Sequence, residues 1–268
     1  MIRQGHELTA DETVSCDVLV IGSGCGGATL AASLAERGRD VVILEKGGYW
    51  TKEDFDQREE HMLAKIDGGR GLDTSDDGGV ALTYGNNVGG ASVHYWADSY
   101  RLPEDRLALW EGDYGIEGHG GERLRPLWER LEADLNVHVA DDSYVNEMNR
   151  RLKAAADAFG WKVERVPQAR RGCVRSGHCM QGCSYDAKQS QLVTHIPRAL
   201  ANGARLYADV EASLLVWQGR RVAQVLAHVQ DRARNRATGV LITVEPKIVV
   251  LAAGGYGTPR FLVRQGLQ

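Results

Sequence analysis

The N-terminal region of the chain combines two short apolar runs with one segment of helical periodicity. The runs at 16–21 and 40–44 have the length and composition of buried strands. Between them, residues 24–37 repeat alanine and leucine at the spacing of one helix face. A strand, a helix and a second strand in this order predict a βαβ unit, whose two strands pair in parallel.

The C-terminal region changes to the pattern of consecutive strands. Apolar runs at 214–217, 222–229 and 240–244 are separated by short polar segments rich in glycine, arginine and asparagine, which predicts an antiparallel meander. A further apolar run, 248–251, is predicted to be a buried strand. Together the two regions predict an α/β protein with a parallel sheet, flanking helices and an antiparallel β-meander.

The middle of the chain, around residues 100–190, has the pattern of a helical and loop segment inserted into this sheet. Helical periodicity is present at 123–135 and 145–159, and it returns after the insertion at 195–201. Before the insertion, residues 67–79 are rich in glycine and aspartate. We expect them to form a solvated surface loop, because these residue types favour turns.

Composition and charge narrow the class of protein. Of the 268 residues, 43% are hydrophobic and 25% are charged, which is typical of a globular protein. A formal net charge of −4 offers no basic field for nucleic acid, so we expect no nucleic-acid partner. The apolar runs, such as 248–253, are far shorter than the ~18 residues that a spanning helix needs. The N-terminus carries no apolar signal segment, and we expect no membrane span and a cytoplasmic location.

The residues that join the first predicted strand to the helix carry the clearest chemical signal. Gly22, Gly24 and Gly27 have the G-x-G-x-x-G spacing, which in a strand–turn–helix context is typical of dinucleotide binding. The first glycine permits a tight turn, the second lets backbone approach a pyrophosphate, and the third lets the helix pack against the strand. Glu45 ends the second strand, where its carboxylate can bind ribose hydroxyls and repel a 2′-phosphate. The motif therefore predicts FAD or NAD rather than NADP.

Further blocks of sequence extend this motif over nearly the whole chain. The four blocks are Gly22–Gly27 with Glu45, Gly85–His94, Gly182–Ser190, and Val249–Gly254 running into Gly257–Pro259. In these blocks the chain resembles the N-terminal, FAD-binding portion of the glucose–methanol–choline (GMC) oxidoreductases. The resemblance implies FAD as the cofactor and a Rossmann-like FAD-binding domain over residues 1–268. It also implies that the catalytic C-terminal half, with its substrate domain, is largely absent from this chain.

The second block has its own physical interpretation. Gly89, Gly90 and Ser92 remove side-chain bulk where backbone could lie against a flavin ring, and His94 follows with two aromatic residues. We therefore predict that these four residues contact the cofactor. Some relatives with a similar pattern carry a histidine here that is covalently joined to the flavin; for His94 a satisfied polar residue is the favoured interpretation, and the covalent link is the alternative.

The fourth block predicts a weaker cofactor contact. The strand at 248–251 runs into small residues, and Ala253 and Gly254 provide an exit where backbone can pass close to a ligand. In the resembling family this junction lies beside the FAD. Thr258 is predicted to be the N-cap of the next helix, with Pro259 at the first helical position.

The loop at 172–183 raises a separate question of metal binding. Cys173, Cys179 and Cys183 lie within eleven residues, with five and three residues between them. Three thiolates suit a [3Fe–4S] cluster, and certain GMC-like dehydrogenases pass electrons from flavin through such a cluster. Zinc would normally need two close pairs of ligands, and it finds only His178 as a fourth ligand here. Reduced structural thiols or a Cys179–Cys183 bridge are favoured over the cluster.

The resemblance implies alcohol oxidation: a base removes the hydroxyl proton while hydride passes from the carbinol carbon to flavin N5. The substrate class is an alcohol or a sugar, with either an electron acceptor or a second polypeptide as a further partner. No position matches the family's catalytic base, which lies in the C-terminal half, so we assign no catalytic residue. The alternative is a non-catalytic flavin-binding or electron-transfer fragment.

Overall fold

The computed structural model describes residues 1–267. The chain forms two compact units. The first unit contains Met1–Tyr95, His178–Asp186 and the chain from Ser190 onwards; the second contains Trp96–Gly177 and Ala187–Gln189. Each unit is described by itself, beginning with the first, which contains every residue predicted to bind the dinucleotide.

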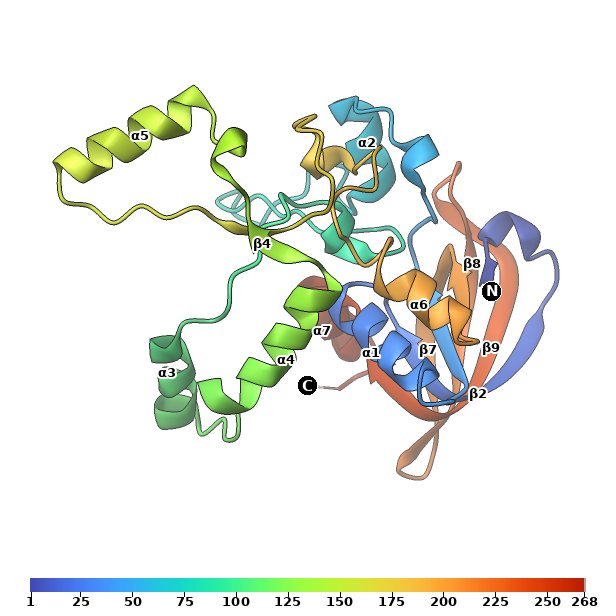
Figure 1. Cartoon of the computed structure of the whole chain (residues 1–268). Coiled ribbons are helices and arrows are strands. Elements are labelled where there is room, and N and C mark those ends of the chain that lie inside the picture. Colours follow the sequence, from blue (N-terminus) through green and yellow to red (C-terminus); the bar gives the residue numbers. More distant parts are fainter. Residues whose placement is uncertain (268) are drawn as a thin grey trace. The chain divides into compact units, whose positions relative to one another are not determined.

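The first unit is built on one mixed sheet, whose strands are coloured from blue to red in Figure 1. Its strands are β1 (Ile2–Arg3), β2 (Glu12–Ile21), β3 (Val41–Glu45), β6 (Arg205–Ala208), β7 (Val210–Gln218), β8 (Arg221–Asp231) and β9 (Arg236–Leu251). Their order across the sheet is β1-β6-β3-β2-β9-β8-β7. Neighbours from β1 to β9 pair in parallel, and β9, β8 and β7 pair antiparallel. The predicted α/β class, with a parallel sheet and an antiparallel meander, is confirmed.

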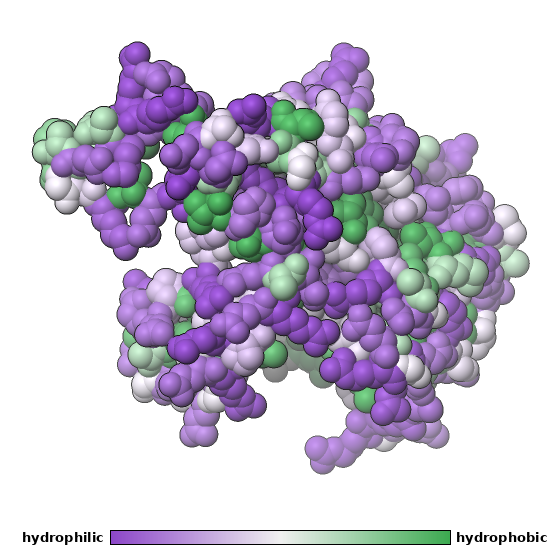
Figure 2. All heavy atoms as spheres, viewed as in Figure 1, coloured by the Kyte–Doolittle hydropathy of each residue, from purple (hydrophilic) through white to green (hydrophobic). Residues whose placement is uncertain are grey.

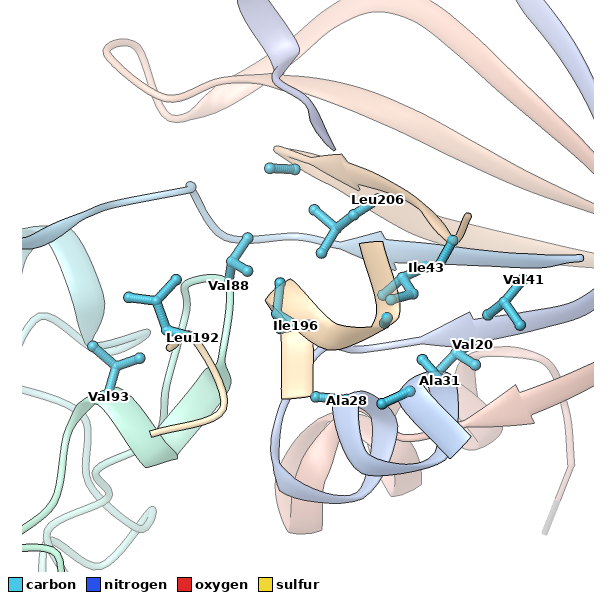
Figure 3. Close-up of a cluster of buried hydrophobic side chains, with 14 of the residues drawn as sticks. Val20, Ala28, Ala31, Val41, Ile43, Val88, Val93, Leu192, Ile196 and Leu206 are labelled. Atoms are coloured by element: carbon cyan, nitrogen blue, oxygen red, sulfur yellow. The ribbon is translucent and has the colours of Figure 1, made fainter. Parts of the chain in front are cut away.

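The predicted βαβ unit is formed by β2, α1 (Cys25–Ala35) and β3. Alternate side chains of β2 pack into two different hydrophobic clusters, one on each face of the sheet. Val18 and Val20 join a cluster with the alanines of α1 and with α6 (His195–Ala201), which Figure 3 shows. Leu19 and Ile21 join a second cluster with side chains of β7, β8 and β9. Because both faces of the strand are covered, its sequence is a continuous apolar run rather than an alternating one.

Strand β9 corrects the prediction of two strands at 240–244 and 248–251. It is one strand, which pairs antiparallel with β8 up to Val244 and in parallel with β2 from Ile242 to Leu251. The polar residues in its middle suggested an interruption, but Pro246 lies in register with Cys16 of β2. The predicted burial of the last run is also wrong, since Ile248 is 58% exposed and the other three residues are half-buried.

Shorter elements complete the first unit. They are η1 (Gly5–Glu7), η2 (Lys52–Asp54), α2 (Glu59–Ile66), η3 (Gly90–Val93), η5 (Cys179–Gln181) and α7 (Gly254–Arg264). The helix predicted at 195–201 is confirmed as α6. Helix α2 was not predicted, although Met62 and Ile66 are buried on one side of it. Its eight residues are too few for helical periodicity to stand out.

The second unit contains α3 (Glu104–Tyr114), α4 (Gly121–Asp134), η4 (Asp142–Tyr144) and α5 (Glu147–Ala158), with a small antiparallel pair of β4 (Val137–Val139) and β5 (Pro167–Ala169). Helices α4 and α5 confirm the predictions at 123–135 and 145–159. Hydrophobic side chains are exposed along α5, including Met148 at 73% and the adjoining Phe159 at 72%, and green spheres mark this region in Figure 2. Among the described residues, no helix has both the length and the apolar character to cross a bilayer.

Candidate dinucleotide site

The predicted site lies at the carboxyl ends of three neighbouring parallel strands. Strand β2 is followed by the glycine turn, β3 ends at Glu45, and β9 leads into Ala252 and Ala253. The chain leaves β2 through α1 towards β3 on one side, while β9 lies on the other. In open α/β sheets, ligands bind at such a reversal of strand order.

Gly22 and Gly27 are required by the packing of the turn. Gly22 has a φ of +104°, and a Cβ atom on it would lie 2.4 Å from the carbonyl oxygen of Ala252. A Cβ atom on Gly27 would lie 2.0 Å from the carbonyl oxygen of Gly22. Both distances exclude a side chain. The glycine at 22 therefore lets the turn pack against the end of β9, and the glycine at 27 lets α1 pack against the turn.

Gly24 is the N-cap of α1, and no side chain caps the helix there. The first turn of a helix has backbone N–H groups without partners inside the helix. Cys25 and Gly26 are exposed in this turn, and a Cβ atom on Gly26 would meet no heavy atom within 4 Å. The N-terminus of α1 is therefore open to an anion, as a pyrophosphate requires.

The carboxylate of Glu45 is buried and already holds three hydrogen bonds. Its Oε2 accepts the backbone N–H and the hydroxyl of Ser23, at 3.0 and 2.7 Å, and its Oε1 accepts the N–H of Gly47 at 2.8 Å. Burial raises the pKa of Glu45, although these donors act in the opposite direction. Since a carboxylate offers about four lone-pair positions, Oε1 keeps one for a ribose hydroxyl. A second bond to ribose would have to replace a bond to Ser23.

Ser23 is a site residue that sequence reasoning missed. It is fully buried between the first two glycines, and its hydroxyl accepts the N–H of Gly89 at 3.1 Å while it donates to Glu45. One hydroxyl thus joins the glycine turn, the end of β3 and the second glycine block. The sequence feature that could have identified Ser23 is a hydroxyl residue between the first two glycines of the motif.

The second glycine block lies directly against the first. A Cβ atom on Gly90 would lie 2.7 Å from the Cα atom of Gly24. Gly89 and Gly90 have φ angles of +96° and +57°, in the left-handed region that favours glycine. The structure therefore brings these two predicted residues together with Gly24, and backbone lies against backbone where Gly90 meets Gly24.

Ser92, which was also predicted to contact the cofactor, uses its hydroxyl inside the block. The hydroxyl donates to the carbonyl oxygen of Gly89 at 2.6 Å and accepts the N–H of Gln191 at 2.9 Å. The residue is only 4% exposed. In the structure its evident role is to hold the Gly89 turn and to tie it to the segment that precedes α6.

His94 is buried, and both of its ring nitrogens face protein groups. Nδ1 lies 2.6 Å from the carbonyl oxygen of Met180; because a carbonyl only accepts, Nδ1 carries the proton in this bond. Nε2 lies 3.6 Å from Oδ1 of Asp67, and both side chains are almost fully buried. At this distance Nε2 makes no hydrogen bond; the Asp67 carboxylate instead accepts backbone N–H groups, including that of Tyr84 at 3.0 Å.

Asp67 also corrects part of the loop prediction. Most residues of the predicted surface loop at 67–79 are exposed or half-buried, as expected. Asp67 itself is 1% exposed, since its carboxylate folds the start of the loop by accepting the N–H groups of Gly69 and Gly71. An aspartate in a polar loop gave no sequence signal of this burial.

The exit from β9 lies beside the glycine turn, and the helix that follows begins earlier than predicted. A Cβ atom on Gly22 would lie 3.0 Å from the Cα atom of Ala253. Helix α7 begins at Gly254, so Pro259 lies inside it rather than at its start. Thr258 is therefore not the N-cap; its hydroxyl accepts the N–H of Ala253 at 3.1 Å and fixes the exit of the strand.

The predicted metal site receives no support. Cys173 belongs to the second unit, whereas Cys179 and Cys183 belong to the first. Within residues 1–267, no three His, Cys, Asp or Glu side chains are grouped so that they could hold a metal ion. An iron–sulfur cluster and a zinc site both need such a group. Of the two remaining alternatives, the Cys179–Cys183 bridge is not formed, and all five cysteines are thiols.

Comparison with known proteins gives consistent matches. A family model described as GMC oxidoreductase matches residues 16–268. An uncharacterized GMC-type oxidoreductase of Sinorhizobium fredii is 30% identical over the whole chain, which covers 52% of that protein. Long-chain-alcohol oxidase FAO3 of Arabidopsis thaliana is 28% identical over 95% of the chain, which covers 35% of it. The chain thus spans between about a third and about half of these relatives.

Solved structures share the fold at low sequence identity. An FAD-dependent oxidoreductase from Chaetomium thermophilum matches with a TM-score of 0.72 and 18% identity, over 94% of this chain and 48% of that protein. At this identity the match concerns the fold alone.

Proposed function

Since this chain belongs to the GMC oxidoreductase family, we propose that it forms the FAD-binding portion of an oxidoreductase that acts on the CH–OH group of an alcohol or a sugar. The observation that carries the proposal is the meeting of two glycine blocks beside the buried carboxylate of Glu45. The name of the Arabidopsis relative, a long-chain-alcohol oxidase, supports the substrate class.

Each part of the site has a part of FAD to hold. The open N-terminus of α1 would bind the pyrophosphate through backbone N–H groups. Oε1 of Glu45, with its unused lone pair, would accept a ribose hydroxyl. The turn at Gly89 and Gly90 would let backbone lie close to the cofactor, because it presents no side chains where it meets Gly24.

The same carboxylate selects against NADP. Glu45 has no cationic side chain among its hydrogen-bond partners, which are Ser23 and Gly47. A 2′-phosphate on the ribose would place two negative groups next to one another at a buried position. Hydroxyls at that position instead donate to the carboxylate.

Bound FAD supplies the redox chemistry, with flavin N5 as the acceptor of the hydride that leaves the carbinol carbon. The described residues of this chain bind and orient the cofactor. None of its histidines is assigned as the base that takes the hydroxyl proton. His94 is buried with Nδ1 donating to Met180, and His195 is completely buried in α6.

A binding experiment tests the cofactor assignment. The purified chain is titrated with FAD, and quenching of flavin fluorescence gives the dissociation constant. We expect stoichiometric binding, and a loss of about tenfold or more in affinity for Glu45→Ala, because a charge-assisted hydrogen bond is removed. Glu60→Ala, an exposed residue of α2, is the control for the loss of one charge. A soluble, folded chain that takes up no FAD would overturn the proposal.

A second experiment tests the activity. The FAD-loaded chain is mixed anaerobically with a panel of alcohols and sugars, and loss of the oxidised flavin spectrum is followed; turnover is then measured with an artificial electron acceptor. Flavin reduction by one of these substrates supports the oxidoreductase. A loaded chain that none of them reduces would favour the alternative, a flavin-binding or electron-transfer module.

A further inference from the structure

The loop that follows Glu45 runs between two other segments of the first unit. On one side, a Cβ atom on Gly47 would lie 2.0 Å from the carbonyl carbon of Asn86, in the second glycine block. On the other side, a Cβ atom on Gly48 would lie 2.5 Å from Cζ of Arg232. Arg232 comes from the turn between β8 and β9, so the meander reaches the dinucleotide site through this side chain.

The guanidinium of Arg232 is held in one orientation. Its Nε and Nη2 donate to Oδ1 and Oδ2 of Asp209 at 2.7 and 2.6 Å, which is the bidentate geometry that fixes the guanidinium plane. The same group lies over the ring of Trp50, with Cζ 4.1 Å from the ring centroid. Asp209 is 5% exposed at its side chain and Arg232 34%, so water screens this pair only in part.

Asp209 connects this ion pair to the carboxylate of Glu45. Its backbone N–H donates to the carbonyl oxygen of Gly47 at 3.0 Å, and the N–H of Gly47 donates to Oε1 of Glu45 at 2.8 Å. Ala208, which precedes Asp209, is the register partner of Glu45 in the parallel pair of β6 and β3. Gly47 is thus held on both sides, and Oε1 is the oxygen that keeps a lone pair for the ligand.

We propose that Arg232 is a positioning residue for the adenosine end of the FAD site, acting through Asp209 and Gly47 on the carboxylate of Glu45. The guanidinium of Arg232 packs against Gly48 and offsets the charge of Asp209, a second buried carboxylate whose charge acts on Glu45. Without it, the loop loses the group packed against it and the two carboxylates repel one another. This inference rests on the proposed function, since it presumes that the site binds FAD.

The test compares affinity for whole FAD with affinity for its adenosine half. Arg232→Gln and Arg232→Lys are titrated with FAD, and ADP affinity is obtained by competition. We expect Arg232→Gln to weaken FAD and ADP by the same factor, about tenfold or more, while the absorption spectrum of the saturated flavin stays that of the unaltered chain. Arg232→Lys should recover only part of the loss, because an ammonium restores the charge but not the planar bidentate contact. Arg234→Gln is the matched control, since Arg234 lies in the same turn and pairs with Asp231.

The outcomes separate this inference from the proposed function. If the unaltered chain binds neither FAD nor ADP, both fail together. If it binds both and Arg232→Gln binds both equally well, the positioning role is overturned and the FAD site stands. Equal losses in Arg232→Gln and Arg234→Gln would also overturn it, because they would indicate a general effect of charge. If Arg232→Gln does not fold, Arg232→Lys decides: wild-type affinity for ADP in that folded variant contradicts the proposal.

Discussion

Ser23 and Glu45 are joined by two hydrogen bonds to the same oxygen, because both the backbone N–H and the hydroxyl of Ser23 donate to Oε2 of Glu45. The hydroxyl also accepts the N–H of Gly89. One buried hydroxyl oxygen thus joins the carboxylate of Glu45 to the second glycine block, in addition to the backbone contact of Gly90 with Gly24.

We expect Ser23→Ala to destabilise the chain by about 1–3 kcal/mol. The substitution removes one donor from the buried carboxylate and leaves the N–H of Gly89 without its acceptor, and an unmade hydrogen bond at a buried group has a cost of this size. Urea unfolding of the flavin-free chain measures it. Ser33→Ala, on the partly buried side of α1, serves as the control and should change the free energy of unfolding by less than about 0.5 kcal/mol. Equal effects of the two substitutions would contradict the assignment.

The two neighbouring glycines in the first turn of α1 should respond in opposite ways to alanine. Gly27→Ala places a methyl group 2.0 Å from the carbonyl oxygen of Gly22, so helix and turn must separate. We expect a loss of about 3 kcal/mol, the upper part of the range for overpacking. At Gly26 no heavy atom lies within 4 Å of the added methyl group, and alanine should stabilise the helix by about 0.5–1 kcal/mol.

Thermal unfolding of both variants without flavin measures this difference. A fully destabilised Gly27→Ala chain beside a stable Gly26→Ala chain agrees with the prediction. If Gly27→Ala were as stable as the unaltered chain, the close packing of α1 against the turn would be refuted.

The sequence could predict those parts of the site that are formed by residues close to one another along the chain. The strand–turn–helix at Gly22–Gly27 and the acid at the end of β3 follow from local periodicity and glycine spacing, and the structure forms them in that order. The antiparallel meander follows in the same way from the alternation of apolar runs and polar turns. In each case one short window holds all the information that the element needs.

Contacts between distant segments could not be predicted in this way. Periodicity does not show that Gly90 faces Gly24, that Asp67 is buried beside His94, or that Arg232 reaches the loop after β3. Strand β6 was missed because its four residues lie next to a helix signal and gain their place by pairing with β1 and β3. Pro259 predicts a helix start because proline favours the first helical position, but α7 begins at Gly254, five residues earlier.

The pKa of Glu45 gives a prediction about pH. Burial raises it above its ordinary value of 4.5, so the folded chain binds this proton more tightly than the unfolded chain does. Between the ordinary value and the raised one, the folded state carries more protons, and its free energy of unfolding must fall as the pH rises. The fall is at most about 1.4 kcal/mol per pH unit for one group.

Comparison with Glu45→Gln isolates this contribution, because the other carboxyl groups titrate in both proteins. Unfolding free energies are measured from pH 4.5 upwards, and the stability of the unaltered chain relative to Glu45→Gln should decrease with rising pH. Glu60→Gln, measured in parallel, controls for the removal of one exposed carboxylate. A relative stability that increases with pH would show that hydrogen bonds from Ser23 and Gly47 outweigh burial.

The surroundings of His94 predict that FAD is held without a covalent bond. A link through the ring needs a nitrogen that can reach the flavin. Nδ1 donates to Met180, and Nε2, which makes no hydrogen bond, is buried 3.6 Å from Asp67. We therefore expect acid precipitation of the FAD-loaded chain to release all of the flavin into the supernatant. The flavin in the supernatant and in the washed, redissolved pellet is quantified by its absorbance, and His94→Asn serves as the reference for a chain that cannot form the link. A pellet that stays yellow in the unaltered chain, and is colourless in His94→Asn, would show that the ring turns out of its place and bonds to the flavin.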